Sequence, residues 1–252
     1  MRLTFLGTGT SHGIPVPGCH CPVCQSKNKK NKRTRSSLLV EEEGRTILID
    51  TTPEFRIQAL REKLCSLDAV LYTHTHADHL HGIDDLRPFS YERTLPVYGS
   101  PQTLEEIARR FPYIFAPPKL YGGGIPHLQL NPIEAGEFSI YGIPLTAIAL
   151  KHGEADIYGY RIANIAYLTD CSRIPETSYA FLTGLEVLII DALRAEPHST
   201  HFNIAQALQE IRRIRPARAY LTHFSHAVDH QTIKKELPPG VAPSYDGLTL
   251  SL

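Results

Sequence analysis

The chain has 252 residues, in which 26 lysines and arginines balance 26 aspartates and glutamates, so its formal net charge is zero. This balance provides no overall field toward nucleic acid or an anionic membrane. No apolar run approaches the roughly 18 residues of a membrane span. The N-terminal stretch MRLTFLGTGTSHG lacks the pattern of a signal peptide, and the five cysteines are an odd number. We therefore expect a cytoplasmic protein whose thiols bind metal instead of forming disulfides.

Apolar alternation and turn residues predict mainly strands in the first part of the chain. Helical spacing predicts a helix in PEFRIQALREKL, with Pro53 in its first turn. In chain order we expect a strand over residues 2–7 and two strands around a turn at Gly44 over residues 36–50. The helix over residues 53–64 follows, then short strands over residues 68–74 and 96–100 and a second helix over residues 102–110.

Residues 111–126, FPYIFAPPKLYGGGIP, are rich in proline, glycine and aromatic residues and predict a loop. Beyond them we expect strands, with one helix over residues 203–214. The strand-like segments are residues 144–153, 157–170, 187–193, 217–226 and 245–252. No linker or repeat interrupts this order, so we predict one domain over residues 1–252. Mixed strands and helices favour two packed sheets covered by helices, with the active loops at one edge.

The stretch YTHTHADHLHG, residues 72–82, places four histidines and one aspartate within eight residues. His74 and His76 are two residues apart at the end of a predicted strand, which directs both rings to one side. Asp78 and His79 follow at a turn into a helix and can face the same place. Imidazole and carboxylate are ligands for zinc, iron or manganese. A motif that supplies parts of two coordination shells favours two metals about 3.5–4 Å apart.

Further metal ligands are expected at the ends of other predicted strands. His152 ends TAIALKH, Asp170 ends IAYLTD and His223 ends AYLTH. Loops that follow strands meet at one rim of a sheet, so these side chains can complete the metal shells. Asp50 ends TILID in the same manner, and two interpretations stay open: it supports metal ligands from behind, or it is a simple turn residue.

The motif THTHADH with His152, Asp170 and His223 resembles the metallo-β-lactamase superfamily of dinuclear hydrolases. The resemblance implies an α/β fold, the αββα sandwich of two mixed β-sheets flanked by helices, with both metals at the sheet edge. It determines the substrate poorly. It also implies that one metal is held by His74, His76 and His152, the other by Asp78, His79 and His223, and that both are bridged by Asp170.

A second cluster, GCHCPVC, provides Cys19, Cys21 and Cys24 within six residues. Three thiolates can hold one tetrahedral zinc if a fourth donor completes the site. His226, three residues beyond His223, is the candidate for that donor. A saturated site of three cysteines and one histidine is structural, and this zinc knuckle over residues 19–24 would pin the N-terminal loop to the C-terminal metal loop. The alternatives are reduced thiols without metal and a solvent-exposed His226.

The stretch GTGTSHGIPVPGCHCPVC together with THFSH resembles the PhnP-type phosphodiesterases. This resemblance implies a dinuclear phosphodiesterase that cleaves phosphoribosyl 1,2-cyclic phosphate or a related cyclic phosphate ester. Two divalent ions, manganese, zinc or iron, would provide a shared hydroxide that attacks phosphorus, with Asp78 and Asp170 among the catalytic groups. His201, just ahead of a predicted helix, would protonate the leaving group, and His198 is the alternative.

Other functions stay open at this point. A tRNA 3′-processing endoribonuclease shares the H-x-H-x-D-H core, and a lactone or thioester hydrolase shares the fold. A zinc-stabilised binding protein without activity would have lost some metal ligands, and in this chain none is missing. The basic run KNKKNKRTR, residues 27–35, is either solvated surface or a patch that steers an anionic substrate or touches RNA. A small phosphoester is the expected partner, a homodimer and a nucleic acid stay open, and no membrane partner is expected.

Overall fold

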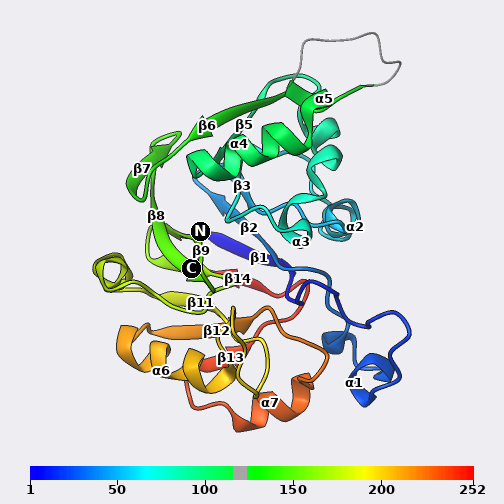
Figure 1. The fold of residues 1–252 in the computed structure, drawn as a ribbon, viewed down its shortest axis with the longest axis vertical. Helices are drawn as coiled ribbons and strands as arrows, with labels where there is room; N and C mark the ends of the chain where they lie inside the picture. Colours follow the sequence, from blue (N-terminus) through cyan, green and yellow to red (C-terminus); the bar gives the residue numbers. More distant parts are fainter. Residues whose placement is uncertain (116–123) are drawn as a thin grey trace.

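Two seven-stranded sheets form the centre of the molecule, which is a computed structural model that describes residues 1–115 and 124–252 (Figure 1). The first sheet has the strand order β14-β1-β2-β3-β4-β5-β6. Its strands are β1 (Arg2–Gly7), β2 (Ser37–Glu42), β3 (Arg45–Ile49), β4 (Ala69–Leu71), β5 (Leu95–Gly99), β6 (Leu128–Pro132) and β14 (Thr249–Ser251).

The second sheet has the order β13-β12-β11-β10-β9-β8-β7. The pairs from β7 to β10 are antiparallel, whereas β10, β11, β12 and β13 run parallel. In the first sheet the pairs from β14 to β3 are antiparallel and those from β3 to β6 are parallel. Both sheets are therefore mixed, as the sequence predicts. The strands are β7 (Gly136–Ile140), β8 (Ile143–His152), β9 (Ala155–Ile162), β10 (Ile165–Leu168), β11 (Val187–Asp191), β12 (Arg218–Thr222) and β13 (Val241–Pro243).

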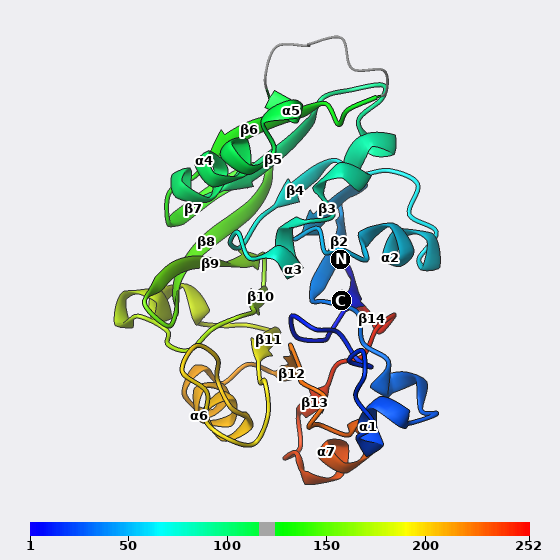
Figure 2. The same cartoon turned by 45° about the vertical axis from the view of Figure 1, so that its right-hand side comes forward.

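Helices cover the outer faces of both sheets (Figure 2). The helix α6 begins after Asn203, whose side chain and that of Gln206 form a reciprocal cap that satisfies the free N–H groups of the first turn. The helices are α1 (Pro22–Gln25), α2 (Phe55–Arg61), α3 (Ala77–Leu80), α4 (Pro101–Arg110), α5 (Pro112–Phe115), α6 (Ile204–Ile214) and α7 (His230–Glu236), with 3-10 turns η1 (Lys29–Asn31), η2 (Ile83–Phe89) and η3 (Glu176–Leu182).

The core has three layers because neighbouring residues of a strand face opposite sides. In β11, Val187 and Ile189 pack between the two sheets, while Leu188 and Ile190 pack under the helices of the second sheet. Burying each such side chain stabilises the fold by about 1.5–3 kcal/mol. The αββα sandwich expected from the sequence is thereby confirmed.

Several local expectations differ from the structure. The helix predicted over residues 53–64 is α2, which begins at Phe55 and not at Pro53, because the Phe55 N–H bonds to Thr52 O and closes a turn ahead of the helix. Residues 112–115, expected as loop, form α5, and residues 116–123 lie outside the described residues. The sequence analysis did not identify β6, β7, β13 and α7. No described helix has the length and apolar character needed to cross a membrane.

Gly82 determines how closely the helix α3 approaches the loop after β3. Its N–H bonds to Thr51 O at 3.0 Å, and the Thr51 N–H bonds to His79 O at 2.8 Å. A Cβ on Gly82 would lie 2.0 Å from Thr52 O. The close approach of these two segments therefore requires glycine at this position.

We expect Gly82→Ala to lower the free energy of unfolding by about 1–3 kcal/mol, because the loop must move to admit the methyl group. Urea unfolding followed by circular dichroism measures this change. Gly124→Ala is the matched control, since its nearest neighbour is Tyr91 Cε1 at 3.8 Å, and it should stay within about 0.5 kcal/mol of wild type. Equal stability of Gly82→Ala and wild type would contradict this packing.

Candidate metal centre

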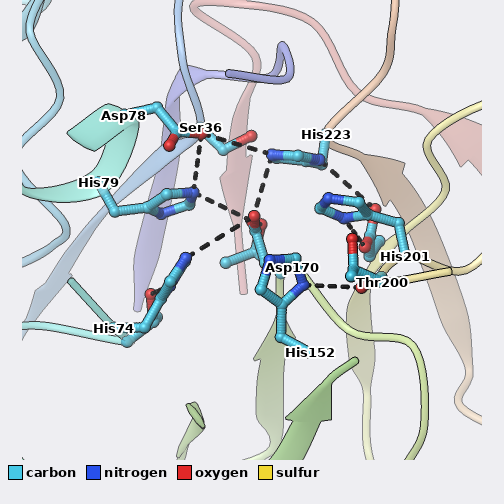
Figure 3. Close-up of polar contacts among 12 residues, drawn as sticks. Ser36, His74, Asp78, His79, His152, Asp170, Thr200, His201 and His223 are labelled. Carbon is cyan, nitrogen blue, oxygen red and sulfur yellow. Dashed lines mark hydrogen bonds and ion pairs between the residues drawn. The ribbon is translucent and has the colours of Figure 1, made fainter. Parts of the chain in front are cut away.

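The candidate active-site ligands lie at or just beyond strand ends, except for Asp78 and His79, which lie in the short helix α3. Figure 3 shows most of them converging around Asp170. One group comprises His74, His76, His152 and Asp170, whose potential ligand atoms lie within 4.8 Å of one another. The other group comprises Asp78, His79, His223 and the same Asp170. The structure thus brings together all seven side chains that the sequence assigns to two metals.

The two oxygens of Asp170 face different groups. Oδ2 lies 3.9 Å from His74 Nε2. Oδ1 lies 3.0 Å from His79 Nε2 and 3.2 Å from His223 Nε2. This arrangement suits a carboxylate that contacts one cation with each oxygen.

The donor atoms fit divalent cations. Within the described chain, Nε2 of His74, His79 and His223 and Oδ2 of Asp78 are buried without any hydrogen-bond partner. A buried polar atom without a partner costs about 1–3 kcal/mol. Ligand atoms at about 2.0–2.1 Å from a tetrahedral zinc lie roughly 3.4 Å apart, and Asp78 Oδ2 lies 3.4 Å from His79 Nε2 and 3.8 Å from His223 Nε2. A cation in each group would satisfy these atoms.

Charge in the centre is balanced between carboxylates and imidazoles. Burial raises the pKa of Asp170, but His223 and His79 outweigh burial and hold that pKa well below its ordinary value. Burial lowers the pKa of His79, but Asp170 and Asp78 outweigh it and raise that pKa well above 6.5. The carboxylates therefore attract positive charge, and a divalent cation would take the place of the proton on His79.

Asp50 holds the ring of His79 from behind. The fully buried Asp50 accepts a hydrogen bond from His79 Nδ1 at 2.7 Å and two more from Thr73 N and Oγ1, each at 2.8 Å. Because Nδ1 carries the proton, Nε2 keeps a free lone pair that can bind a metal ion. His152 is oriented similarly, since its Nδ1 donates to Thr200 O at 2.7 Å. Of the two interpretations of Asp50, the structure favours the supporting one.

Three residues of this centre adopt left-handed backbone conformations, with φ of 64° at Asp50, 53° at Asp170 and 61° at His223. Residues with a Cβ enter this region at a cost because Cβ crowds the backbone, and aspartate does so more readily than histidine. Each residue turns the chain sharply at a strand end and directs its side chain into the centre. Backbone conformations of this kind cluster at functional sites.

The cysteine cluster meets His226 as the sequence predicts. His226 Nδ1 lies 3.2 Å from Cys19 Sγ and 3.6 Å from both Cys21 Sγ and Cys24 Sγ. Zinc–sulfur bonds of about 2.3 Å and a zinc–nitrogen bond of about 2.0 Å place tetrahedral ligands roughly 3.6 Å apart. The hydrogen bond from Cys24 N–H lowers the pKa of Cys21 to about 6, while burial raises the pKa of Cys24 to about 11. Cys21 therefore favours the thiolate that zinc binds, and zinc would displace the proton of Cys24. The geometry fits a closed structural zinc site.

Asp191 is a site residue that the sequence analysis missed. It is fully buried at the end of β11, where Oδ2 accepts from His201 Nδ1 at 2.8 Å and from Cys171 N at 2.9 Å. The ring of His201 stacks on that of His223, with centroids 4.7 Å apart. Burial lowers the pKa of His201. The signal was present in the sequence, because Asp191 ends VLIID just as Asp50 ends TILID.

Other predicted positions lie outside this centre. His81 packs against Phe111, with ring centroids 6.0 Å apart. His198 is exposed beside His201, at a centroid distance of 5.1 Å. The basic run of residues 27–35 is not solvated throughout, because Arg33 is buried and its Nη1 donates to Thr8 Oγ1 and Ser244 O at 2.9 and 2.7 Å.

Comparison with known proteins places this centre in a family. The beta-lactamase superfamily domain matches residues 45–224, a range that contains all seven candidate active-site ligands. The chain belongs to the beta-lactamase superfamily. Within it, the chain is a PhnP-family member, since a solved structure described as a new diphosphatase from the PhnP family is 38% identical to it. That match covers 100% of this chain and 97% of the other, with a TM-score of 0.93.

Other relatives of this PhnP-family chain carry different names. A protein of Porphyromonas gingivalis named octanoyltransferase is 40% identical over 98% of the chain, which spans 51% of that relative's length. A ribonuclease Z of Bradyrhizobium is 30% identical over 66% of the chain and 50% of its own length. The chain thus spans about half of each of these two relatives. Its fold is that of the beta-lactamase superfamily, and its histidine and aspartate clusters could hold metal ions.

We expect Cys21→Ser to remove about one zinc equivalent per chain and to lower the melting temperature by about 5–10 °C, because a closed zinc site contributes folding free energy. Plasma emission spectrometry and calorimetric melting measure the two effects. Cys65→Ser is the control, because Cys65 is exposed and outside the cluster. Unchanged zinc content in Cys21→Ser would exclude this thiol as a ligand.

We expect Asp170→Asn to bind both active-site cations weakly, since the neutral amide removes the charge that faces both groups. Metal content should fall by about two equivalents, while the zinc of the cysteine cluster stays. Asp84→Asn is the control, because the Asp84 side chain is 41% exposed. Retention of both cations by Asp170→Asn would show that the bridging assignment is wrong.

Proposed function

We propose that the protein is a dinuclear metal-dependent phosphohydrolase that cleaves a P–O bond in a small organic phosphate. One observation carries this proposal: the two oxygens of Asp170 face two groups of candidate ligand atoms, with the unpartnered Nε2 of His74 on one side and those of His79 and His223 on the other. The 38% identity to a PhnP-family diphosphatase over the full chain supports phosphate chemistry.

The candidate ligands divide into two shells around Asp170. His74, His76 and His152 would hold one cation, and Asp78, His79 and His223 would hold the other. When bound, the two cations would lower the pKa of a water molecule and neutralise charge on the phosphoryl oxygens. Asp50 fixes the ring of His79 through its Nδ1–H, so this ligand is oriented before the cation arrives.

His201 would deliver the proton that the departing oxygen requires. Asp191 accepts the Nδ1–H of this ring, which leaves Nε2 to exchange a proton with the substrate. Complete burial raises the pKa of Asp191 well above its ordinary value, although His223 and the Cys171 N–H oppose that rise. In this proposal His201 is the catalytic acid and Asp191 is its positioning residue.

Two substrate classes are consistent with this chemistry. A small cyclic phosphodiester, such as phosphoribosyl 1,2-cyclic phosphate, is the substrate that the sequence predicts. An organic diphosphate is the second candidate, and the PhnP-family diphosphatase supports it. A precursor tRNA has weaker support, because the ribonuclease Z match covers 66% of this chain and the net charge is zero.

A metal-controlled substrate screen tests the proposal. We expect turnover of bis-p-nitrophenyl phosphate and of a ribose cyclic phosphate or an organic diphosphate, and none of a precursor tRNA, a lactone or a thioester. Asp170→Asn serves as the inactive control. Turnover of only the lactone or thioester, or of only the tRNA, would replace this proposal with the corresponding alternative.

We expect His201→Ala to retain its metal content and to slow substrates with alkoxide leaving groups about 10²–10⁴-fold, because these need a proton in the transition state. A p-nitrophenolate leaving group should lose far less, since it departs readily as an anion. Steady-state rates over a series of leaving groups measure the difference. Loss of the active-site metals in His201→Ala would assign this residue a ligand role instead.

A further inference from the structure

A cavity of about 250 Å³ lies beside His201 and is distinct from the two groups of metal ligands. His201 is the one residue that it shares with the candidate active site. The remaining walls come from the loop after β1, the loop after β11 and the segment that carries His226. At about 30 Å³ per water molecule, the cavity has room for roughly eight waters, which is ample for a phosphate group.

The walls of this cavity present hydrogen-bond donors and positive charge. Arg194, His198 and His12 line it, and none of the described residues that line it is acidic. The hydroxyl groups of Ser11 and Ser225 belong to the same walls. Guanidinium, imidazole and hydroxyl donors around one space are the groups that bind phosphate oxygens.

Arg194 has donor capacity that the described protein leaves unused. Its Nε is buried and has no hydrogen-bond partner among the described residues. The nearest carboxylate, Glu196 Oε2, lies 3.9 Å away on a side chain that is 70% exposed, so this ion pair is weak. The only hydrogen bond of its guanidinium in the described chain is a long one, 3.4 Å from Nη2 to Pro197 O.

His198 presents a second donor. Its Nδ1 accepts hydrogen bonds from Thr200 N at 3.3 Å and from Thr200 Oγ1 at 3.2 Å. An imidazole that accepts at Nδ1 carries its proton on Nε2. The ring lies 5.1 Å from that of His201, centroid to centroid. His198 thus lies in the same cavity wall as Arg194 and next to His201, the catalytic acid of the proposed reaction.

We propose that this cavity is a binding subsite for a phosphate group on the leaving-group side of the substrate, held by Arg194 and His198. The inference rests on the proposed function, in which His201 protonates the departing oxygen. The part of the substrate that carries this oxygen must lie next to His201, and the cavity is the cationic space there. The preferred substrate then has a second phosphate beyond the scissile bond, either as a phosphorylated sugar or as the far half of a diphosphate.

Direct binding tests the subsite independently of catalysis. Titration calorimetry of the metal-loaded enzyme with ribose 5-phosphate should show binding that weakens about tenfold in Arg194→Met and in His198→Gln. Arg194→Lys keeps the charge and should weaken binding less than Arg194→Met does. Arg212→Met, on the exposed face of α6, should bind as wild type does. Melting temperatures of all variants show whether each is folded.

Substrate pairs then identify the source of the phosphate. One pair is a ribose cyclic phosphate with and without a 5-phosphate, and the other is ADP-ribose and the methyl ester of AMP. For the pair that matches the natural substrate, the ratio of kcat/KM between the members should fall about tenfold in Arg194→Met relative to wild type and to Arg212→Met.

The outcomes separate the two proposals. Equal affinity of wild type and Arg194→Met for ribose 5-phosphate would overturn the subsite, whether or not the enzyme is active. A ratio of kcat/KM unchanged by Arg194→Met in both pairs would overturn it too. Binding that depends on Arg194, without hydrolysis of any phosphate substrate, would support an anion site and overturn the phosphohydrolase function.

Discussion

The burial of candidate ligand atoms that make no hydrogen bond within the described protein is the constraint on which this molecule depends. Asp170 is 2% exposed and is surrounded by imidazole nitrogens that the protein itself does not satisfy. A buried carboxylate is unfavourable unless it is paired or coordinates a cation. The strand ends of both sheets supply these groups, so the packing of the two sheets determines where the candidate metal ligands meet. Hydrophobic layers hold the strands in register, and the cations would compensate for the charge gathered at their ends.

The parts of the site that the sequence revealed are those encoded locally or repeated at strand ends. The histidine motif and the cysteine cluster are short and dense, and His152, Asp170 and His223 each follow an apolar strand. Asp191 also ends an apolar strand, but that position does not indicate its partner, because His201 lies ten residues away across an irregular loop. The edge strands β6 and β7 were missed because their side chains are mostly half-exposed and weakly apolar. Packing against distant segments decides such elements.

One short segment connects the two candidate metal sites. His223 faces Asp170, and His226, three residues on, faces the cysteines. Between them, Phe224 is tied to the loop after β1 by hydrogen bonds from its N–H to Thr8 O and from the Thr10 N–H to its carbonyl, both 3.0 Å. The buried Arg33 lies over the Phe224 ring at 4.6 Å. Zinc in the cysteine site would therefore stabilise the same segment that carries the candidate ligand His223 and lines the adjoining cavity.

The left-handed backbone conformations of Asp50, Asp170 and His223 place candidate site residues at positions where glycine would be less strained. Glycine adopts such conformations without strain, so the backbone at these turns favours glycine, and the conformational cost of a side chain is greatest at His223, about 1 kcal/mol or more. Selection for thermal robustness alone would therefore tend to erode the centre. A stabilised variant of this protein is best sought at sites remote from these three turns, where gains in rigidity do not compete with chemistry.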